Sequence, residues 1–232
     1  MSKGRWIITG ASSGIGLALS KAALAAGYEV LGVSRRDVPE LEGETGWEYF
    51  CADLSKADQV EQVPLKGAKN GPTVLVNNAG VISPIGPAHD YVWDAISEHF
   101  SINVTAPMRL SARFLNEVAG ERQVYFTGSG AASYPIEGWA AYCASKAAVH
   151  QYAEVLAKEH PEVRIHAFRP GKVDTPMQGE IRSVSGHGFP SQHLFVEAHV
   201  QGDLVAPEAV ARKLIETAEA AERPETIFSL NA

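Results

Sequence analysis

A short apolar segment that runs directly into a glycine-rich turn constrains the fold of this chain more than any other feature. Residues 6–9 have the apolar character of a buried strand, Gly10, Gly14 and Gly16 follow, and residues 17–26 are rich in alanine and favour a helix. Glycine tolerates the dihedral angles of a tight turn and leaves no side chain in the way, so backbone amides and the helix N-terminus can face a phosphate. The segment therefore predicts a strand, a phosphate-binding turn and a helix.

The end of the next predicted strand carries two arginines and no acid. Residues 28–33 form that strand, and Ser34-Arg35-Arg36 follow it before Asp37. In a dinucleotide site, an acid here accepts a hydrogen bond from the ribose 2′-hydroxyl of NAD, whereas arginine attracts the 2′-phosphate of NADP. The pattern favours NADP(H) over NAD(H); the alternative is that both arginines are simply solvated.

Predicted strands and helices alternate along the rest of the chain. We expect strands at 47–51, 73–76, 123–127, 163–168 and 226–230, and helices at 55–63, 91–119, 142–159 and 207–221. The 232 residues suffice for one sizeable α/β domain and are few for two. We therefore predict a single domain that spans residues 1–232.

The segment 177–205 is polar and shows no clear periodicity. It contains Gly179, Gly186, Gly188 and Pro190, and long loops beside an α/β sheet often act as lids. We interpret it as a substrate lid. His187, His193 and His199 are spaced by six residues, so they do not share a helical face, and no carboxylate pattern completes a metal site. No metal is therefore predicted.

Composition and charge narrow the class of partner. The net charge of −7 argues against nucleic acid or an anionic membrane, since both favour a clustered basic surface, and leaves a small molecule as the expected partner. No segment approaches the roughly 20 apolar residues needed to span a bilayer, and the first apolar run is too short for a signal peptide. We predict a cytoplasmic protein in which Cys51 and Cys143 are reduced thiols.

Polar residues stand where predicted strands end. Asn77-Asn78-Ala79-Gly80 follows one strand and suits a crevice crossed by a cofactor, although the same residues form ordinary turns. Asp53 is positioned to accept a hydrogen bond from an adenine amino group, or else Asp53 or Ser55 only caps a helix.

Asn103 lies inside a predicted helix, where asparagine is locally unfavourable. It indicates a specific hydrogen bond or a kink, which Pro107 can also cause.

A tyrosine and a lysine four residues apart form the strongest chemical hypothesis. Tyr142 and Lys146 lie on one face of a predicted helix, and Ser129 precedes Tyr142 by 13 residues across one loop. A free phenol has a pKa of about 10, and a nearby cation favours the phenolate and lowers that value. The pair predicts a tuned acid/base, although this spacing is also common for surface pairs.

Taken together, these segments resemble the short-chain dehydrogenase/reductase family over nearly the whole chain. The resemblance rests on Thr9-Gly10-Ala11-Ser12-Ser13-Gly14-Ile15-Gly16, Asn77-Asn78-Ala79-Gly80, Asn103, Ser129, Tyr142 with Lys146, and Pro170-Gly171-Lys172-Val173-Asp174-Thr175. Three segments are similar to the sepiapterin reductase and benzil reductase branch, which is NADPH-dependent: Gly138-Trp139-Ala140-Ala141-Tyr142-Cys143-Ala144, Asp174-Thr175-Pro176-Met177-Gln178 and Gly202-Asp203-Leu204-Val205.

The resemblance implies a doubly wound, Rossmann-type parallel sheet with helices on both faces, and a homodimer with helices around 91–119 and 142–159 at its interface. It implies that NADP(H) contacts Gly10, Ser12, Ser13, Gly14, Ile15, Gly16, Ser34, Arg35, Arg36, Asp53, Leu54, Asn78, Ala79, Gly80, Tyr142, Lys146, Pro170, Gly171, Val173, Thr175 and Met177. It also implies a carbonyl substrate contacted by Ser129, Pro135, Trp139, Tyr142 and Gln178, with Phe189 or Phe195 as further walls.

The family likeness assigns four catalytic roles. Ser129 stabilises negative charge on the carbonyl oxygen, and Tyr142 supplies the proton. Lys146 lowers the pKa of Tyr142 and binds the nicotinamide ribose, while Asn103 holds a water that links Lys146 to solvent. The expected activity is NADPH-dependent reduction of a ketone or diketone to an alcohol.

Two other functions stay open at this point. One is a pterin reductase, although the pterin-reducing members use an aspartate near the C-terminus and this chain ends in Phe228-Ser229-Leu230-Asn231-Ala232. The other is a sensor or scaffold that binds NADP(H) without turnover, which needs the glycine turn but not all four catalytic residues. The natural carbonyl compound, its stereochemistry and the physiological direction do not follow from these motifs.

Overall fold

In residues 2–184 and 188–230, which the computed structural model describes, seven parallel strands form one sheet. The strands are β1 (Arg5–Thr9), β2 (Glu29–Ser34), β3 (Trp47–Cys51), β4 (Thr73–Asn77), β5 (Arg122–Thr127), β6 (Arg164–Arg169) and β7 (Ile227–Ser229). Their order is β3-β2-β1-β4-β5-β6-β7, so the direction of winding reverses between β1 and β4. The predicted doubly wound sheet is confirmed. The residues Gly186, His187, Asn231 and Ala232, named in the predictions, lie outside the described ranges.

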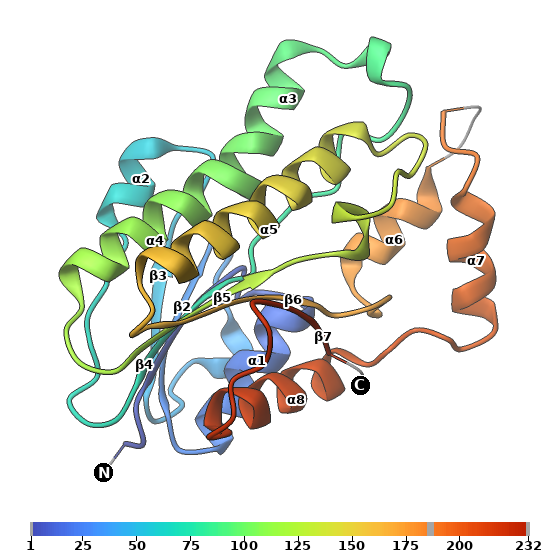
Figure 1. Ribbon diagram of the computed structural model, residues 1–232. Coiled ribbons are helices and arrows are strands. Elements are labelled where there is room, and N and C mark those ends of the chain that lie inside the picture. The colour runs from blue at the N-terminus through green and yellow to red at the C-terminus, as the bar shows by residue number, and fades with distance from the viewer. Residues whose placement is uncertain (1, 185–187, 231–232) are drawn as a thin grey trace.

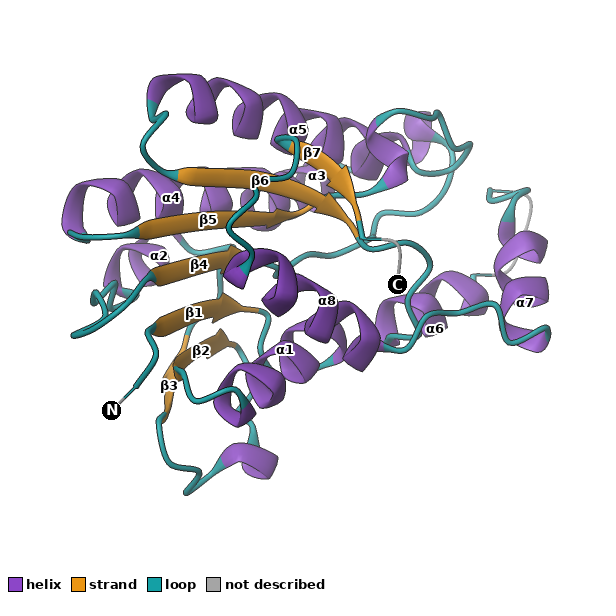
Figure 2. Cartoon of the chain, turned by 60° about the horizontal axis from the view of Figure 1, so that its bottom comes forward, coloured by secondary structure: helices purple, strands orange, loops and turns teal. Residues whose placement is uncertain are grey.

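Helices cover both faces of the sheet (Figures 1 and 2). One face carries α2 (Ala57–Gln62), α4 (Ala106–Glu117) and α5 (Ala140–Glu159), and the other carries α1 (Gly14–Ala25) and α8 (Pro207–Glu219). Because successive side chains of a strand point to opposite faces, Ile7 packs on the α4 side while Trp6 and Ile8 pack on the α1 side. Burial on both faces explains why the strands read as continuous apolar runs.

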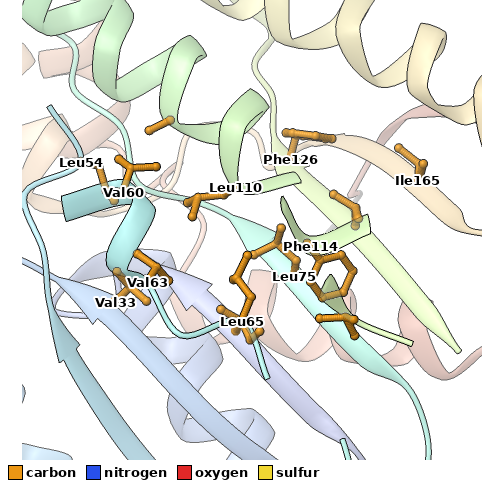
Figure 3. Packing of buried hydrophobic residues seen from close by; sticks show 14 of the residues in the cluster. Val33, Leu54, Val60, Val63, Leu65, Leu75, Leu110, Phe114, Phe126 and Ile165 are labelled. Carbon is orange, nitrogen blue, oxygen red and sulfur yellow. The ribbon is translucent and has the colours of Figure 1, made fainter. Parts of the chain in front are cut away.

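The core between α4 and the sheet is shown in Figure 3. Leu110 and Phe114 point from α4 towards Leu75, with Val63 and Leu65 from the segment after α2 beside them. Phe114 is 0% exposed and Leu110 is 1% exposed. This packing holds α4 on the sheet and thereby sets the position of the chain that leads into it.

The long helix predicted at 91–119 is divided. α3 (Trp93–Phe100) is followed by a π-helical stretch, Ser101–Thr105, and then by α4. Pro107 cannot donate to the carbonyl of Asn103, four residues earlier, so regular α-helical bonding fails at this point. The Asn103 side chain bonds the backbone of Val81, so both expectations for Asn103 hold: it makes a specific hydrogen bond, and it lies where the helix is irregular.

The segment predicted as an aperiodic lid contains two helices, α6 (Pro176–Ser183) and α7 (Gln192–Val200). Pro176 starts α6 in the first turn, where a missing N–H is tolerated. The helices lie beyond the carboxyl ends of the strands (Figure 1) and contact each other. The sequence missed them because polar and glycine residues hide their periodicity, while Ile181, Phe189 and Phe195 bury apolar side chains there. A lid function remains a prediction.

Across the described ranges, no helix is both long and apolar enough to cross a membrane. The same residues contain no group of three or more His, Cys, Asp or Glu arranged to hold a metal ion. Cys51 is exposed and Cys143 is half-buried, and neither forms a disulfide.

Replacing Phe114 with alanine is expected to lower the free energy of unfolding by about 3–5 kcal/mol, because a fully buried ring is removed and a cavity is left. Urea titration of the cofactor-free protein measures this as a lower midpoint at unchanged slope. Met108→Ala is the matched control, since Met108 lies on the same helix but is 38% exposed, and its cost is expected to stay within about 0.5 kcal/mol. Equal losses in the two variants would contradict this account of the core.

Candidate functional site

A cavity of about 910 Å³ lies at the carboxyl ends of the strands. In a doubly wound sheet this edge, at the reversal of winding, is where ligands bind. Most of the residues predicted for cofactor, substrate and catalysis line it: Gly10, Ser12, Ser13, Gly14, Ile15, Ser34, Arg35, Arg36, Asp53, Leu54, Asn78, Ala79, Gly80, Ser129, Trp139, Tyr142, Lys146, Pro170, Gly171, Val173, Thr175, Met177 and Gln178. Four predicted residues do not line it, namely Gly16, Asn103, Pro135 and Phe189.

The first turn brings a helix N-terminus to the cavity. Gly10 has a φ of 70° and its N–H donates to the carbonyl of Val33, which ties the turn to β2. Ser13 stands at the N-cap of α1 without a side-chain capping bond. The first N–H groups of α1 have no partner within the helix, so they and the helix dipole are available to an anion. The cavity wall here fits a pyrophosphate.

Gly16 and Asn78 support this turn. A Cβ on Gly16 would lie 2.2 Å from the carbonyl oxygen of Gly10, so only glycine permits the close packing. The Asn78 amide nitrogen donates to Thr9 O at 3.0 Å, and its amide oxygen accepts from the Thr127 hydroxyl at 3.2 Å. Asn78, which follows β4, therefore links β1 and β5 through its side chain. Its amide group is used in hydrogen bonds within the protein at the cavity wall.

The end of the cavity beside β2 and β3 carries positive charge. Arg35 and Arg36 are exposed and line the wall, and the Ser34 hydroxyl donates to the carbonyl of Arg36 at 2.7 Å, which orders the turn. A carboxylate oxygen of Asp53 accepts from the N–H of Ser55 at 2.9 Å. Asp53 thus closes a turn before α2, and neither it nor Ser55 is the N-cap, which is Lys56. Arg35 and Arg36 are thus the residues at this end of the cavity that could hold a phosphate group.

At the other end, three predicted catalytic side chains face one space. Tyr142 and Lys146 lie on the buried face of α5, with exposures of 8% and 4%. Lys146 Nζ is 5.5 Å from the centroid of the Tyr142 ring and donates to the carbonyl of Thr127 at 2.8 Å. Ser129 Oγ accepts from the N–H of Ala131 at 3.1 Å, which leaves the hydroxyl hydrogen free to donate.

Burial decides the protonation of this pair. It raises the pKa of Tyr142 to about 12, against a smaller lowering effect of the Ser129 hydroxyl, and it lowers the pKa of Lys146 to about 8. The effect expected of Lys146 on the pKa of Tyr142 stays a prediction. The cost of desolvating a phenolate sets the direction of the Tyr142 shift, and the ammonium group of Lys146 donates its hydrogen bond to Thr127. Tyr142 is therefore protonated at neutral pH.

An aromatic cluster forms the wall beside Tyr142. The Trp139 ring contacts Tyr142 with centroids 5.5 Å apart, Phe195 at 5.1 Å and Phe189 at 5.4 Å. Trp139 and Phe195 line the cavity, and Phe189 packs behind them. Pro135 is exposed and lies off the wall, so the predicted contact is replaced by its neighbours Tyr134 and Ile136.

Several lining residues were not predicted. They are Val33, Ala52, Val81, Ile82, Ile102, Thr127, Gly128, Gly130, Ala131, Tyr134, Ile136, Arg169, Lys172, Pro176, Glu180, Ile181, Ser229 and Leu230. Some of them adjoin predicted residues, such as Val81 after Gly80 and Arg169 before Pro170. Ser229 and Leu230 reach the cavity because β7 lies beside β6 at the edge of the sheet. The sequence predicts a strand at 226–230, but no local motif indicates its place in the strand order.

Comparison with known proteins agrees with this arrangement. Residues 5–185 match the family model described as short chain dehydrogenase. The chain is 33% identical over 225 residues to a benzil reductase ((S)-benzoin forming) of Bacillus subtilis, covering 92% of this chain and 93% of that protein. It is 31% identical over 235 residues to the sepiapterin reductase of Bos taurus, covering 90% and 87%. The crystal structure of the KRED1-Pglu enzyme matches with a TM-score of 0.85 and 29% identity, covering 97% and 99%.

The buried ammonium predicts a pH-dependent cost of folding. Between pH 8 and the ordinary lysine value, the unfolded chain binds a proton at Lys146 that the folded chain does not, so stability rises with pH. The unfolding free energy of the cofactor-free protein, minus that of Lys146→Met, is expected to rise by about 1 kcal/mol per pH unit between pH 8 and 10. Urea titrations at each pH measure it, with Lys158→Met on the exposed face of α5 as control. A difference that is flat with pH would show that Lys146 stays charged when folded.

Proposed function

Since this chain belongs to the short-chain dehydrogenase family and is an oxidoreductase, we propose that it is an NADPH-dependent carbonyl reductase acting on ketones or diketones with aromatic groups. The observation that carries the proposal is one cavity with three parts. Arg35 and Arg36 line one end, the glycine turn lines the middle, and Ser129, Tyr142 and Lys146 line the other end beside Trp139. The arginines suit the 2′-phosphate of NADPH, the glycine turn suits its pyrophosphate, and the third group suits the carbonyl that is reduced.

The protein side of the reaction follows from the residues. When bound, NADPH supplies the hydride that reduces the carbonyl carbon. Ser129 donates its free hydroxyl hydrogen to the carbonyl oxygen, where negative charge develops. Tyr142, held protonated by burial, delivers the proton to that oxygen. Lys146 keeps positive charge near the phenol as the proton leaves.

The aromatic wall supports the choice of substrate. Trp139 and Phe195 offer large apolar faces, and aromatic pairs gain about 0.5–1.5 kcal/mol beyond area burial. Similarity to benzil reductases points the same way, since benzil is an aromatic diketone. Similarity to sepiapterin reductases makes pterins the second class to test. The last described residues, Phe228 to Leu230, include no acid that would anchor a pterin.

The direct test supplies the purified protein with NADPH and, separately, benzil, a quinone and sepiapterin, and follows the loss of nicotinamide absorbance. We expect turnover with benzil and little with sepiapterin, and chiral chromatography of the product identifies the face attacked. Binding of NADPH without turnover of any carbonyl would favour the alternative of a non-catalytic sensor. A homodimer through α4 and α5 is a further expectation from the family.

Replacing Tyr142 with phenylalanine is expected to lower kcat about 10²–10⁴-fold, because the proton donor is lost while the ring is kept. The dissociation constant for NADPH, from fluorescence titration, is expected to stay nearly unchanged. Tyr134→Phe is the matched control, since Tyr134 also lines the cavity but is 69% exposed. Near-normal turnover by Tyr142→Phe would remove Tyr142 from the mechanism.

Arg35→Asp is expected to shift cofactor preference from NADPH towards NADH. A carboxylate repels the 2′-phosphate and removes a charge-assisted contact, so kcat/KM for NADPH should fall about 10–100-fold. Steady-state kinetics with both cofactors give the ratio, and Arg212→Asp, at an exposed position of α8 away from the cavity, controls for the change of charge. An unchanged ratio would mean that Arg35 does not read the phosphate.

A further inference from the structure

A fully buried histidine adjoins the catalytic side chains without lining the cavity. His99, in the last turn of α3, is 0% exposed. Its Nδ1 lies 2.7 Å from the carbonyl oxygen of Ser83, and its Nε2 lies 3.0 Å from both the Asn103 amide nitrogen and the Ser145 hydroxyl. All of its polar atoms are therefore engaged with named partners.

The hydrogen bonds determine which nitrogen of His99 carries the proton. Asn103 Oδ1 accepts from the N–H of Val81 at 2.9 Å, and Asn103 Nδ2 donates to the carbonyl of Val81 at 2.8 Å, so the amide cannot be flipped. The second hydrogen of Asn103 Nδ2 has two acceptors in reach, His99 Nε2 at 3.0 Å and the Ser145 hydroxyl at 3.4 Å, and the shorter contact makes Nε2 the unprotonated acceptor. The remaining nitrogen, Nδ1, carries the hydrogen and donates to Ser83 O.

The same network reaches the catalytic helix. Ser145, on α5 between Tyr142 and Lys146, is 0% exposed, and its hydroxyl oxygen lies 2.9 Å from the carbonyl oxygen of Tyr142, with one hydrogen to donate to that oxygen or to His99 Nε2. Ser145 Oγ is also 3.0 Å from His99 Nε2. His99 thus contacts side chains from two elements, the π-helical stretch with Asn103 and the first turns of α5.

We propose that His99 is a positioning residue for Asn103: its neutral imidazole, protonated on Nδ1, holds the Asn103 amide against Val81 and keeps the π-helical stretch in register with Tyr142 and Lys146. This inference rests on the proposed function for its catalytic consequence. A Cβ on Gly80 would lie 3.3 Å from Asn103 Oδ1 and 3.8 Å from Lys146 Nζ, so both side chains lie beside Gly80, which lines the cavity. His99 itself touches no reacting atom.

Two variants separate the acceptor from the rest of the side chain. His99→Gln keeps an oxygen near the place of Nε2, whereas His99→Asn keeps a donor for Ser83 O and loses the acceptor for Asn103. We expect His99→Asn to lower kcat with benzil about tenfold, a change of about 1.4 kcal/mol in the barrier. The dissociation constant for NADPH should stay unchanged, and His99→Gln should restore most of kcat.

A readout without turnover keeps this proposal separate from the proposed function. In the cofactor-free protein, NMR measures hydrogen exchange of the Asn103 side-chain amide, which we expect to accelerate about tenfold or more in His99→Asn and to stay slow in His99→Gln. His166→Asn is the matched control, because His166 is another buried histidine whose Nδ1 contacts a carbonyl, that of Glu225 at 3.1 Å, far from Asn103 in the hydrogen-bond network. It should change neither kcat nor the exchange of Asn103.

The outcomes are decisive even if a variant fails to fold. Nitrogen chemical shifts of wild-type His99 report the tautomer, and a proton on Nε2 would overturn the proposal. Wild-type kcat and slow Asn103 exchange in His99→Asn would overturn it as well. If the wild-type protein reduces no carbonyl, the proposed function fails, while the tautomer and the exchange rates still decide the role of His99.

Discussion

The close approach of the first turn to the ends of its neighbouring strands is the contact on which the rest of the site depends. At Gly16 a methyl group would lie 2.2 Å from the carbonyl oxygen of Gly10, and at Gly10 it would lie 2.9 Å from Cα of Ala79. The absence of side chains lets α1 start directly over β1 and lets β4 end against the same turn. The reversal of strand order at β1 and β4 then opens the crevice that becomes the cavity.

Burial links stability to chemistry at the other end of that cavity. Burial keeps Tyr142 protonated and disfavours the charge on Lys146. The buried ammonium group therefore lowers the free energy of unfolding at neutral pH. Trp139 Nε1, Gln178 Oε1 and Arg169 Nε, all on residues that line the cavity, are buried without a hydrogen-bond partner within the described structure. Such groups cost about 1–3 kcal/mol each.

The polar network behind the site shows why Asn103 tolerates an unfavourable place in a helix. Pro107 has no N–H to donate to the carbonyl of Asn103, so the helix is irregular there. The Asn103 side chain bonds the backbone of Val81 and contacts His99. An amphipathic pattern read along residues 91–119 indicates one helix and an irregular asparagine, but it says nothing of His99, since a histidine in a helical stripe has no distinctive spacing. The partners of His99 come from three separate segments, at Ser83, Asn103 and Ser145.

The sequence by itself determined the strand–turn–helix start, the alternation that yields a parallel sheet, and the residues most directly involved, because glycine conformation, side-chain periodicity and the spacing of Tyr142 and Lys146 are local properties of the chain. Only the tertiary structure decided what depends on surroundings. It formed α6 and α7 from a segment without clear periodicity, left Pro135 outside the cavity, and brought Leu230 to its wall. It also set the burial that raises the pKa of Tyr142, since desolvation depends on the atoms packed around a group and is not encoded in its neighbours along the chain.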